Sequence, residues 1–316
     1  MGHNPQLPAF GGPKKSPIFG AVTPLLLIPF LLMDEPVPAL LDIEQPSVTI
    51  RRDDSLYSVP LKRSVRLDIV LPPEYDASGP VYPVLYLNDG QDLPRLRMTA
   101  VLDSLYKQQA IRPFVLVAIH AGDRIQEYGT GARADYLGRG SKAGLYTDFV
   151  LTELLPYVHK HYRVSQKPDD AVFAGFSLGG LSAFDIVFHH PDRFSRAGVF
   201  SGSFWWRSKS TQAGYRDETD RIMHDLVRKG DYHKTLKFWF ETGTDDETSD
   251  RNNNGIIDAI DDTTDLIDEL VKKGYSRPGS GQPTDIRYVE IPGGQHNPDT
   301  WGRIMPDFLT WAFNNQ

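Results

Sequence analysis

The sequence predicts an α/β fold in which a mostly parallel central sheet, with an antiparallel start, carries helices on both faces. From Pro46 onward, short apolar runs alternate with longer segments of helical periodicity, which is typical of an α/β sheet. Several runs, such as Phe114–Ile119, are apolar throughout, and this suits strands that are buried on both faces of a parallel sheet. The first two expected strands have no helix between them, so we expect the sheet to begin with an antiparallel pair.

Residues 47–316 are expected to form the main domain, and they contain no internal repeat. The strands are expected at Val48–Arg51, Val65–Leu71, Val81–Leu87, Phe114–Ile119, Val172–Gly175, Ala197–Phe200, Leu236–Thr242 and Ile286–Ile291. The helices are expected near Arg97–Lys107, Ala143–His161, Leu178–His190, Thr219–Lys229, Ala259–Lys273 and Thr300–Phe313. Residues 120–142 are rich in Gly, Arg, Asp and Tyr, and they predict a surface loop over the carboxyl edge of the sheet.

Residues 1–46 differ from the rest of the chain. They are rich in Pro and Gly and carry the basic pair Lys14 and Lys15 before an apolar run from Ile18 to Met33. Together with the small residues that follow, this order loosely matches a secretory signal, which would make the protein periplasmic or secreted. The alternatives are an anchor close to lipid or an irregular arm packed on the domain, and the alternative location is the cytoplasm. No other segment could span a bilayer.

The composition excludes several classes of site. The chain of 316 residues has no cysteine, which excludes disulfides, thiolate metal sites and a thiol nucleophile. The formal net charge is −7, yet residues 245–269 alone hold ten carboxylates and one arginine, so the rest of the chain is close to neutral. A nearly neutral remainder argues against nucleic-acid binding, whereas a local cluster of carboxylates predicts a cation site or a solvated face.

A candidate nucleophile lies between an expected strand and an expected helix. The stretch Gly175–Gly179 reads Gly-Phe-Ser-Leu-Gly, which is the pattern of a nucleophile elbow in the strand-turn-helix context that this motif requires. Such a turn raises the hydroxyl of Ser177 above the edge of the sheet and directs the N–H of Leu178 at the same space, as an oxyanion hole requires. The alternative is a plain strand-to-helix turn whose serine caps the helix.

A serine hydroxyl also needs a base and an acid, which follow it in the order Ser, acid, His in α/β-hydrolases. Of the nine histidines, His296 alone follows the acidic loop near residue 245, and it lies in a Gly-rich loop just after the last expected strand. The alternative is a surface histidine. Asp245, Asp246 and Glu247 follow the preceding strand, and the residues themselves do not choose among them. The turn Leu87–Gln91 is expected to supply the second oxyanion donor through the N–H of Gln91.

These stretches together resemble the putative esterase family of α/β-hydrolases, which includes enterochelin esterases, feruloyl and acetyl-xylan esterases, and mycolyltransferases. The similarity covers about residues 60–316 in the expected order. The stretches that carry it are Ala174–Gly180 around the serine, Leu87–Asp92 at the oxyanion turn, Phe200–Trp206 beside the pocket, and Gly293–Trp301 around the histidine.

The resemblance implies an α/β-hydrolase fold and cleavage of a carboxylic ester through an acyl-serine. Gly243-Thr244-Asp245-Asp246 is similar to the family's acid loop, in which the acid stands three residues after the glycine, and this implies Asp246 as the triad acid. The acyl group is not fixed by the resemblance. Four residues could line a pocket for an aromatic or sugar-bearing ester, or else the tryptophans pack in the core and the other two make surface contacts. They are Trp205, Trp206, Arg124 and Tyr128.

A second motif predicts a calcium site. Residues 250–261 match the EF-hand calcium loop, in which oxygen side chains at alternating positions converge because Gly255 turns the chain sharply. The expected ligands are Asp250, Asn252, Asn254, the carbonyl of Ile256, Asp258 and Asp261. Position 12 is Asp261 and not Glu, so the loop resembles dockerin-type loops more than sensor EF-hands. We expect the ion to stiffen the acid loop, and the alternative is a solvated turn rich in Asn and Asp.

The sequence thus predicts a serine esterase with a structural calcium ion, with no organic cofactor and with a small-molecule or carbohydrate-linked ester as substrate. Two alternatives stay open. The first is an acyltransferase that passes the acyl group to a sugar, and the second is a calcium-dependent binding module without catalysis. The sequence does not set the oligomeric state.

Overall fold

The computed structural model describes residues 1, 47–279 and 284–314. The secretory signal, anchor or arm expected within residues 1–46 therefore lies outside the described residues. The described chain from residue 47 onward packs into one unit.

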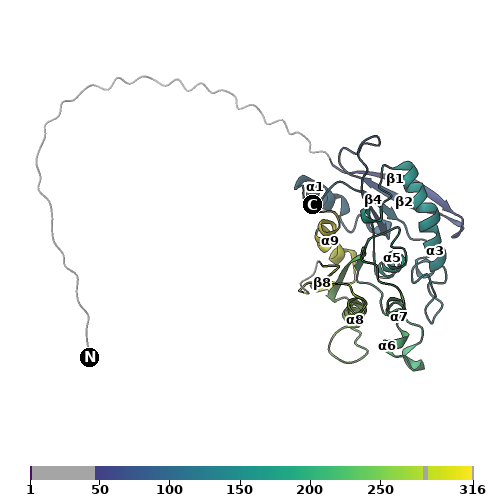
Figure 1. Cartoon of the computed structure of the whole chain (residues 1–316), viewed down its shortest axis with the longest axis vertical. Coiled ribbons are helices and arrows are strands. Elements are labelled where there is room, and N and C mark those ends of the chain that lie inside the picture. The colour runs from purple at the N-terminus through teal and green to yellow at the C-terminus, as the bar shows by residue number, and fades with distance from the viewer. Residues whose placement is uncertain (2–46, 280–283, 315–316) are drawn as a thin grey trace, which may run out of the picture. The chain divides into compact units, whose positions relative to one another are not determined.

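An eight-stranded sheet lies at the centre of this unit, in the order β1-β2-β4-β3-β5-β6-β7-β8 (Figure 1). Its strands are β1 (Thr49–Ser58), β2 (Arg63–Leu71), β3 (Val84–Asn88), β4 (Val115–Ile119), β5 (Ala171–Phe176), β6 (Arg196–Phe200), β7 (Lys237–Asp245) and β8 (Ile286–Gln295). The β1–β2 and β2–β4 pairs are antiparallel, whereas the other neighbours are parallel. The expected strands are all present, and the expected antiparallel start is confirmed.

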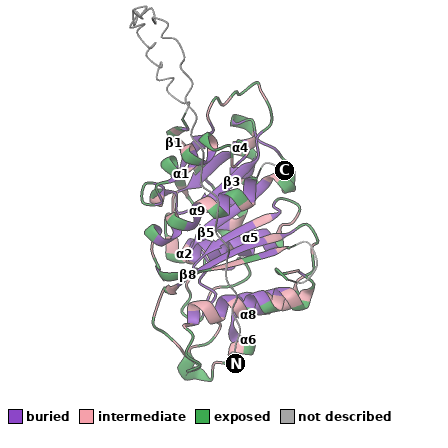
Figure 2. Ribbon diagram, turned by 90° about the vertical axis from the view of Figure 1, so that its left-hand side faces the viewer, coloured by how far each residue is buried: buried purple, intermediate pink, exposed green. Residues whose placement is uncertain are grey.

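Successive residues of the central strands enter two separate cores. In β3, Val84 and Tyr86 belong to one core, and Leu85 and Leu87 belong to the other. The strands β3, β4 and β5 are buried along their whole length, and Figure 2 shows β3 and β5 in purple. Because both faces are covered, these strands carry the unbroken apolar runs that predicted a parallel sheet.

Helices cover both faces of the sheet (Figure 1). One core contains α1 (Met98–Lys107) and α9 (Pro298–Phe313). The other contains α3 (Ala143–Phe149), α4 (Leu155–His161), α5 (Leu178–His189), α7 (Ile222–Lys229) and α8 (Asp258–Lys273). Two short helices, α2 (Arg124–Glu127) and α6 (Asp217–Asp220), lie in the loops.

Two expected helices differ from the structure in detail. The stretch 143–161 is continuous, but a π-helical turn at Val150–Leu154 joins α3 to α4. The helix expected to begin at Thr219 is interrupted at Arg221, whose backbone is extended (φ −75°, ψ 114°). The guanidinium of Arg221 there binds Asp262 of α8 at 2.8 Å, and this contact was not readable from the local sequence.

The carboxyl ends of the parallel strands meet at one edge of the sheet, which we call the catalytic edge. The loops after β3, β5, β7 and β8 gather there, and these are the loops that carry the predicted site residues. None of the helices within the described residues is both long and apolar enough to cross a lipid bilayer.

Candidate active site

Ser177 stands between β5 and α5 in a strained backbone conformation, with φ 55° and ψ −121°. The turn is so tight that a Cβ at position 175 would lie 2.3 Å from the carbonyl oxygen of Gly179. Ser177 occupies the N-cap position of α5, but its side chain makes no capping hydrogen bond. Its Oγ instead lies 3.2 Å from the Oγ of Ser203. Strain that serves no capping role is typical of a functional residue, so this geometry favours the nucleophile over the cap.

The acid and the base come together from the ends of β7 and β8. The Nδ1 of His296 lies 3.8 Å from Oδ2 of Asp246, whose side chain is fully buried while that of His296 is 41% exposed. Two glycines allow this approach, because a Cβ at position 243 would lie 2.2 Å from the carbonyl oxygen of Gly294. Of the three candidate acids, Asp246 is therefore the one whose carboxylate faces the imidazole. In active sites, the contact between a base and its acid is often longer before substrate binds.

Trp301 of α9 joins the histidine loop to the serine turn. Its ring stacks on Phe176 with centroids 4.9 Å apart, and the ring of His296 packs edge-on against it at 5.4 Å. Its Nε1–H donates a hydrogen bond of 2.9 Å to the Oγ of Ser201. Because Phe176 directly precedes Ser177, one buried side chain contacts the elements that carry the candidate base and the candidate nucleophile.

The two expected oxyanion donors belong to turns that are bonded together. Leu178 is the first residue of α5 and Gln91 lies in the short 3₁₀ helix Gly90–Asp92, so neither N–H is needed by an intrahelical bond. The side chain of Asn88 links the turns, because its amide donates a hydrogen bond of 2.8 Å to the carbonyl of Gly179. The Tyr146 hydroxyl in turn donates to the Asn88 oxygen at 2.5 Å.

Arg124 supports the same turns from the loop after β4. It donates two hydrogen bonds, of 2.9 and 3.0 Å, to the buried carboxylate of Asp89, and a third of 3.0 Å to the carbonyl of Phe176. Burial would lower the pKa of the guanidinium, but the ion pair with Asp89 outweighs this effect and the pKa is raised. Arg124 thus links the oxyanion turn to the serine turn through hydrogen bonds to both.

The other expected pocket residues lie in different surroundings. Trp206 and Tyr128 are fully buried in the core. For Trp206 this is the core packing that the sequence left open as an alternative, whereas for Tyr128 the alternative was a surface contact. We therefore do not assign these two residues to substrate contact. Trp205 is half-buried and lines a pocket of about 500 Å³ next to the acid loop. The guanidinium of Arg139 lies over its ring, 4.7 Å from the centroid.

The sequence analysis did not identify Glu241, whose carboxyl group lies in the middle of β7. Its side chain is fully buried, and neither of its oxygens has a hydrogen-bond partner within the described residues. Burial, and next the charge of Asp246, raise the pKa of Glu241 to about 8. The sequence signal that could have identified it is a carboxylic acid directly after the apolar run Phe238–Phe240.

Four of the six expected calcium ligands come together where the loop after β7 meets α8, whose first turn carries Asp261. The Nδ2 atoms of Asn252 and Asn254 both donate to Oδ2 of Asp261, at 2.9 and 2.8 Å. Asp250 accepts hydrogen bonds from the backbone N–H groups of Asn254 and Gly255, at 3.1 and 2.9 Å. Ile256 follows this turn with its side chain 43% exposed. The side chains of Asp250, Asn252, Asn254 and Asp261 thus lie close together, with their hydrogen bonds made within the motif.

Asp258, the expected ligand at position 9, instead forms an ion pair with Arg251. An Oδ atom of Asp258 lies 3.1 Å from the guanidinium of Arg251, which also binds Asp217 and the buried Asp262. Across residues 47–279 and 284–314, no three or more His, Cys, Asp or Glu side chains are grouped so that they could hold a metal ion. Any cation in this loop would therefore depend on asparagine and carbonyl oxygens as well as on carboxylates.

Residues 58–310 match the profile of a protein family described as "Putative esterase". The chain belongs to this esterase family. The family that the motifs predict is thereby confirmed, and its description agrees with the predicted carboxylic-ester hydrolase.

Two curated relatives each match a little less than half of the chain. YbbA, an uncharacterized protein of Bacillus subtilis, is 27% identical over 147 residues, which are 45% of this chain and 58% of YbbA. The iron(III) enterobactin esterase of Escherichia coli K12 is 36% identical over 141 residues, which are 43% of this chain and 32% of that esterase. The matched part thus spans less than two thirds of each relative's length.

Solved esterase structures share the fold. The enterochelin esterase from Shigella flexneri superposes with a TM-score of 0.63 at 24% identity, over 84% of this chain and 59% of that one. A ferulic acid esterase gives a TM-score of 0.63 at 19% identity, over 85% of this chain and 98% of that one. These likenesses confirm the predicted α/β-hydrolase fold.

Proposed function

We propose that this esterase-family protein is a serine carboxylic-ester hydrolase that works through an acyl-enzyme, with Ser177, Asp246 and His296 as its triad. The observation that carries the proposal is the strained backbone of Ser177 at the catalytic edge, where its hydroxyl does not cap α5. The approach of the Asp246 carboxylate to His296 from the two neighbouring strand ends supports it. A binding module without catalysis would have no need of all three groups.

The first half-reaction forms the acyl-enzyme. Ser177 Oγ attacks the carbonyl carbon of the ester while its proton passes to Nε2 of His296. The oxyanion of the tetrahedral intermediate accepts hydrogen bonds from the N–H groups of Leu178 and Gln91. The intermediate then collapses, the bond to the alcohol oxygen breaks, and the alcohol leaves with the proton from His296.

The second half-reaction releases the acid. Water gives a proton to His296 while its oxygen attacks the acyl carbon, and collapse of the second intermediate returns the proton to Ser177 and frees the carboxylic acid, which ionises. Asp246 holds the Nδ1–H of His296 and stabilises the imidazolium that forms in each half. Its carboxylate is suited to this role because it is buried and has no competing hydrogen-bond partner in the described structure.

We propose that the substrate carries an aromatic or sugar-bearing group that contacts Trp205. The pocket beside this ring is also lined by Tyr136, Arg139, Arg207 and the acid-loop neighbour Glu247, so it offers both stacking surfaces and charged donors. The name of one structural relative, a ferulic acid esterase, agrees with an aromatic acyl group.

Hydrolysis by wild type and by Ser177→Ala, across a panel of aryl acetates, feruloyl sugars and trilactones, tests the proposal. We expect Ser177→Ala to lower kcat by about 10³-fold or more on every substrate that the wild type cleaves, because the acyl-enzyme cannot form. Ser55→Ala, at an exposed position of β1, is the matched control and should retain full activity.

Two outcomes of this experiment would contradict the proposal. Persistent hydrolysis by a folded Ser177→Ala protein would show that another group is the nucleophile. Transfer of the acyl group to added sugars in preference to water would replace the hydrolase with the acyltransferase alternative.

We also propose that residues 250–261 bind one calcium ion. The ligands would be Asp250, Asn252, Asn254, the Ile256 carbonyl and Asp261, with Asp258 reached through water because its carboxylate pairs with Arg251. The hydrogen bonds from Asn252 and Asn254 to Asp261 support this assignment, since they show that three side chains of the motif lie next to one another. Gly255, with φ +87°, gives the turn that such a loop requires.

Metal analysis and thermal unfolding of chelator-treated protein test the calcium proposal. At a calcium concentration of 100 times Kd we expect stabilisation of about 3 kcal/mol, which Asp250→Asn should reduce or abolish. Asp268→Asn on the exposed face of α8 is the matched control and should leave the calcium response unchanged. Absence of bound calcium together with an unchanged melting temperature would refute the site.

A further inference from the structure

A second hydroxyl group lies against the candidate nucleophile. The Oγ of Ser203 is 3.2 Å from the Oγ of Ser177, and the backbone N–H of Ser203 donates a hydrogen bond of 3.2 Å to the carbonyl oxygen of Ser177. Ser203 is buried, and in the part of the chain that the structure describes its hydroxyl has no other hydrogen-bond partner. Ser203 is not a member of the proposed triad, yet its side chain touches the atom that would attack the substrate.

The segment that carries Ser203 is held in place from two neighbouring elements. It follows β6, and its first residue, Ser201, has φ 47°, a left-handed conformation that is unfavourable for serine. The N–H of Ser201 donates a hydrogen bond of 2.8 Å to the carbonyl of Glu241 in β7, and its Oγ accepts the hydrogen bond from Trp301 of α9. Backbone strain that the surroundings maintain in this way is typical of functional sites. The position of the Ser203 hydroxyl is therefore fixed by the fold.

The proposed reaction sets the direction of the hydrogen bond between the two hydroxyls. Ser177 passes its own proton to His296 when it attacks, so this proton is not available to Ser203. Ser203 is then the donor, and its O–H group points at the oxygen that becomes negatively charged during the attack. A hydrogen bond to a charged oxygen is stronger than one to a neutral hydroxyl. The contact thus stabilises the transition state more than the resting enzyme, as catalysis requires.

We propose that Ser203 is a further catalytic residue, whose hydroxyl donates a hydrogen bond to Ser177 Oγ while that oxygen carries negative charge. This inference rests on the proposed serine mechanism. The hydrogen bond is used twice in each cycle, first when Oγ attacks the ester and again when Oγ leaves the acyl carbon and takes its proton back from His296. Ser203 keeps its own proton throughout, so none of its covalent bonds forms or breaks.

Stopped-flow hydrolysis of p-nitrophenyl acetate tests the proposal, because the burst of nitrophenol reports acylation and the steady state reports deacylation. Ser203→Ala should slow both steps by about 10- to 100-fold, since each loses a hydrogen bond to a charged oxygen. KM should stay within about threefold of the wild-type value, because the lost interaction is made only in the transition states. A variant that merely disturbed the packing around the substrate would raise KM.

A fluorophosphonate probe gives a second measurement that needs no knowledge of the natural substrate. Ser177 Oγ attacks its phosphorus, fluoride leaves, and the proton passes to His296, so the rate of labelling reports the nucleophile alone. Mass spectrometry locates the label. We expect labelling at Ser177, slowed in Ser203→Ala by a factor similar to that of acylation.

Two further variants at the same position separate the hydroxyl from its volume. Ser203→Thr keeps the hydroxyl and should recover most of both rates. Ser203→Cys fills the space with a group that is only a weak donor, so it should be slowed as Ser203→Ala is. The cysteine variant also provides the measurement if the alanine variant does not fold, and melting temperatures show which variants are folded.

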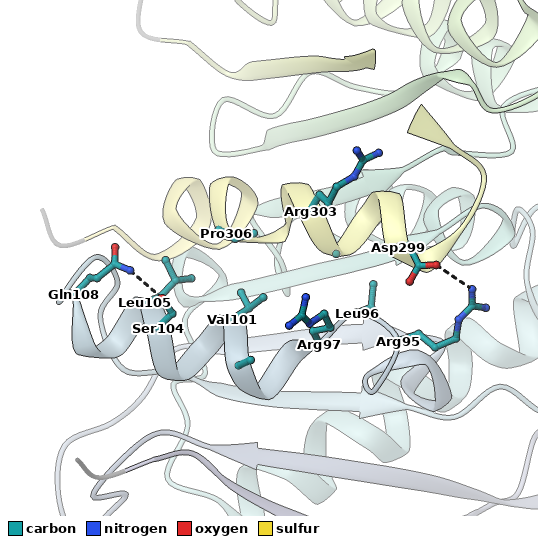
Figure 3. Close-up of a pocket in the computed structure, with 12 residues that line it drawn as sticks. Arg95, Leu96, Arg97, Val101, Ser104, Leu105, Gln108, Asp299, Arg303 and Pro306 are labelled. Carbon is teal, nitrogen blue, oxygen red and sulfur yellow. Dashed lines mark hydrogen bonds and ion pairs between the residues drawn. The ribbon is translucent and has the colours of Figure 1, made fainter. Parts of the chain in front are cut away.

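Two serines away from the catalytic edge are the matched controls. Ser195 is buried directly before β6, at the opposite end of that strand from Ser201. Ser104 is exposed on α1, where its Oγ accepts a hydrogen bond of 2.9 Å from Gln108 beside the groove between α1 and α9 (Figure 3). Ser195→Ala and Ser104→Ala should leave both rates unchanged.

The inference is overturned if folded Ser203→Ala and Ser203→Cys keep wild-type rates, or if a folded Ser203→Thr is no faster than they are. Rates above wild type in Ser203→Ala would also overturn it, because Ser203 would then hold the nucleophile away from its base. Loss of activity in Ser177→Ala together with full activity in Ser203→Ala would reject this inference alone. Persistent hydrolysis by Ser177→Ala, or a probe that labels another residue, would reject the proposed function and this inference with it.

Discussion

Two carboxyl groups near the catalytic edge, those of Asp246 and Glu241, differ in their electrostatic surroundings. In the proposed reaction Asp246 stabilises a protonated His296, whereas Glu241, in the middle of the preceding strand β7, is buried and feels the charge of Asp246. Two negative charges close together in a buried site repel each other. The proton therefore remains on the carboxyl group whose surroundings disfavour the charged form more. Glu241 is the neutral member, because burial raises its pKa to about 8.

This difference makes the stability of the protein depend on pH. In the unfolded chain Glu241 releases its proton near pH 4.5, whereas in the folded protein it holds the proton up to about pH 8. The stabilisation that this proton provides is therefore complete below pH 4.5 and is lost as the pH rises to about 8.

Glu241→Gln should remove this loss, because the amide is neutral at every pH. Relative to wild type, the variant should gain stability steadily from pH 5 to about pH 8 and no further up to pH 9, by at most about 5 kcal/mol, with part of the gain offset by the buried amide. Urea midpoints across this range measure the effect, with the exposed Glu218→Gln as control. A constant difference between Glu241→Gln and wild type over the whole range would contradict the assignment.

At the scale of elements, the strands could be predicted and some loops could not. Runs such as Phe114–Ile119 are apolar throughout because the strand is buried on both faces, so the sequence itself contains the signal. The break at Arg221 depends on Asp262, which lies 41 residues further along the chain, so no local pattern could reveal it. Likewise, Tyr128 lies in a polar loop whose composition indicates exposure, yet its ring is fully buried.

The candidate site shows the same division between local and distant information. Ser177 was predictable because the strained turn requires glycines at fixed positions beside it. Asp246 could be preferred to Asp245 and Glu247 only through the resemblance to a family, because the choice depends on where the loop after β8 brings His296. Glu241 was missed because a strand pattern indicates burial but not whether a buried acid has a partner.

At the scale of the whole molecule, the catalytic edge depends on the core beneath α9. That helix carries the histidine loop at its start, and its buried ring Phe308 packs edge-on against Phe200 of β6, with centroids 5.2 Å apart. Gly198 leaves room for the same ring, because a Cβ there would lie 2.4 Å from it. The position of His296 and the packing of the sheet are therefore held by one set of contacts.

Phe308→Ala should consequently destabilise the fold and the site together. We expect a loss of roughly 3–5 kcal/mol, because the ring is fully buried and the rigid sheet beneath cannot close the cavity. Urea unfolding followed by circular dichroism and by ester hydrolysis should give coincident transitions, both shifted to lower urea, whereas the exposed Asp307→Ala should leave both in place. Activity that disappears well before the circular dichroism signal would mean that α9 detaches alone, and that the histidine loop is held independently of the core.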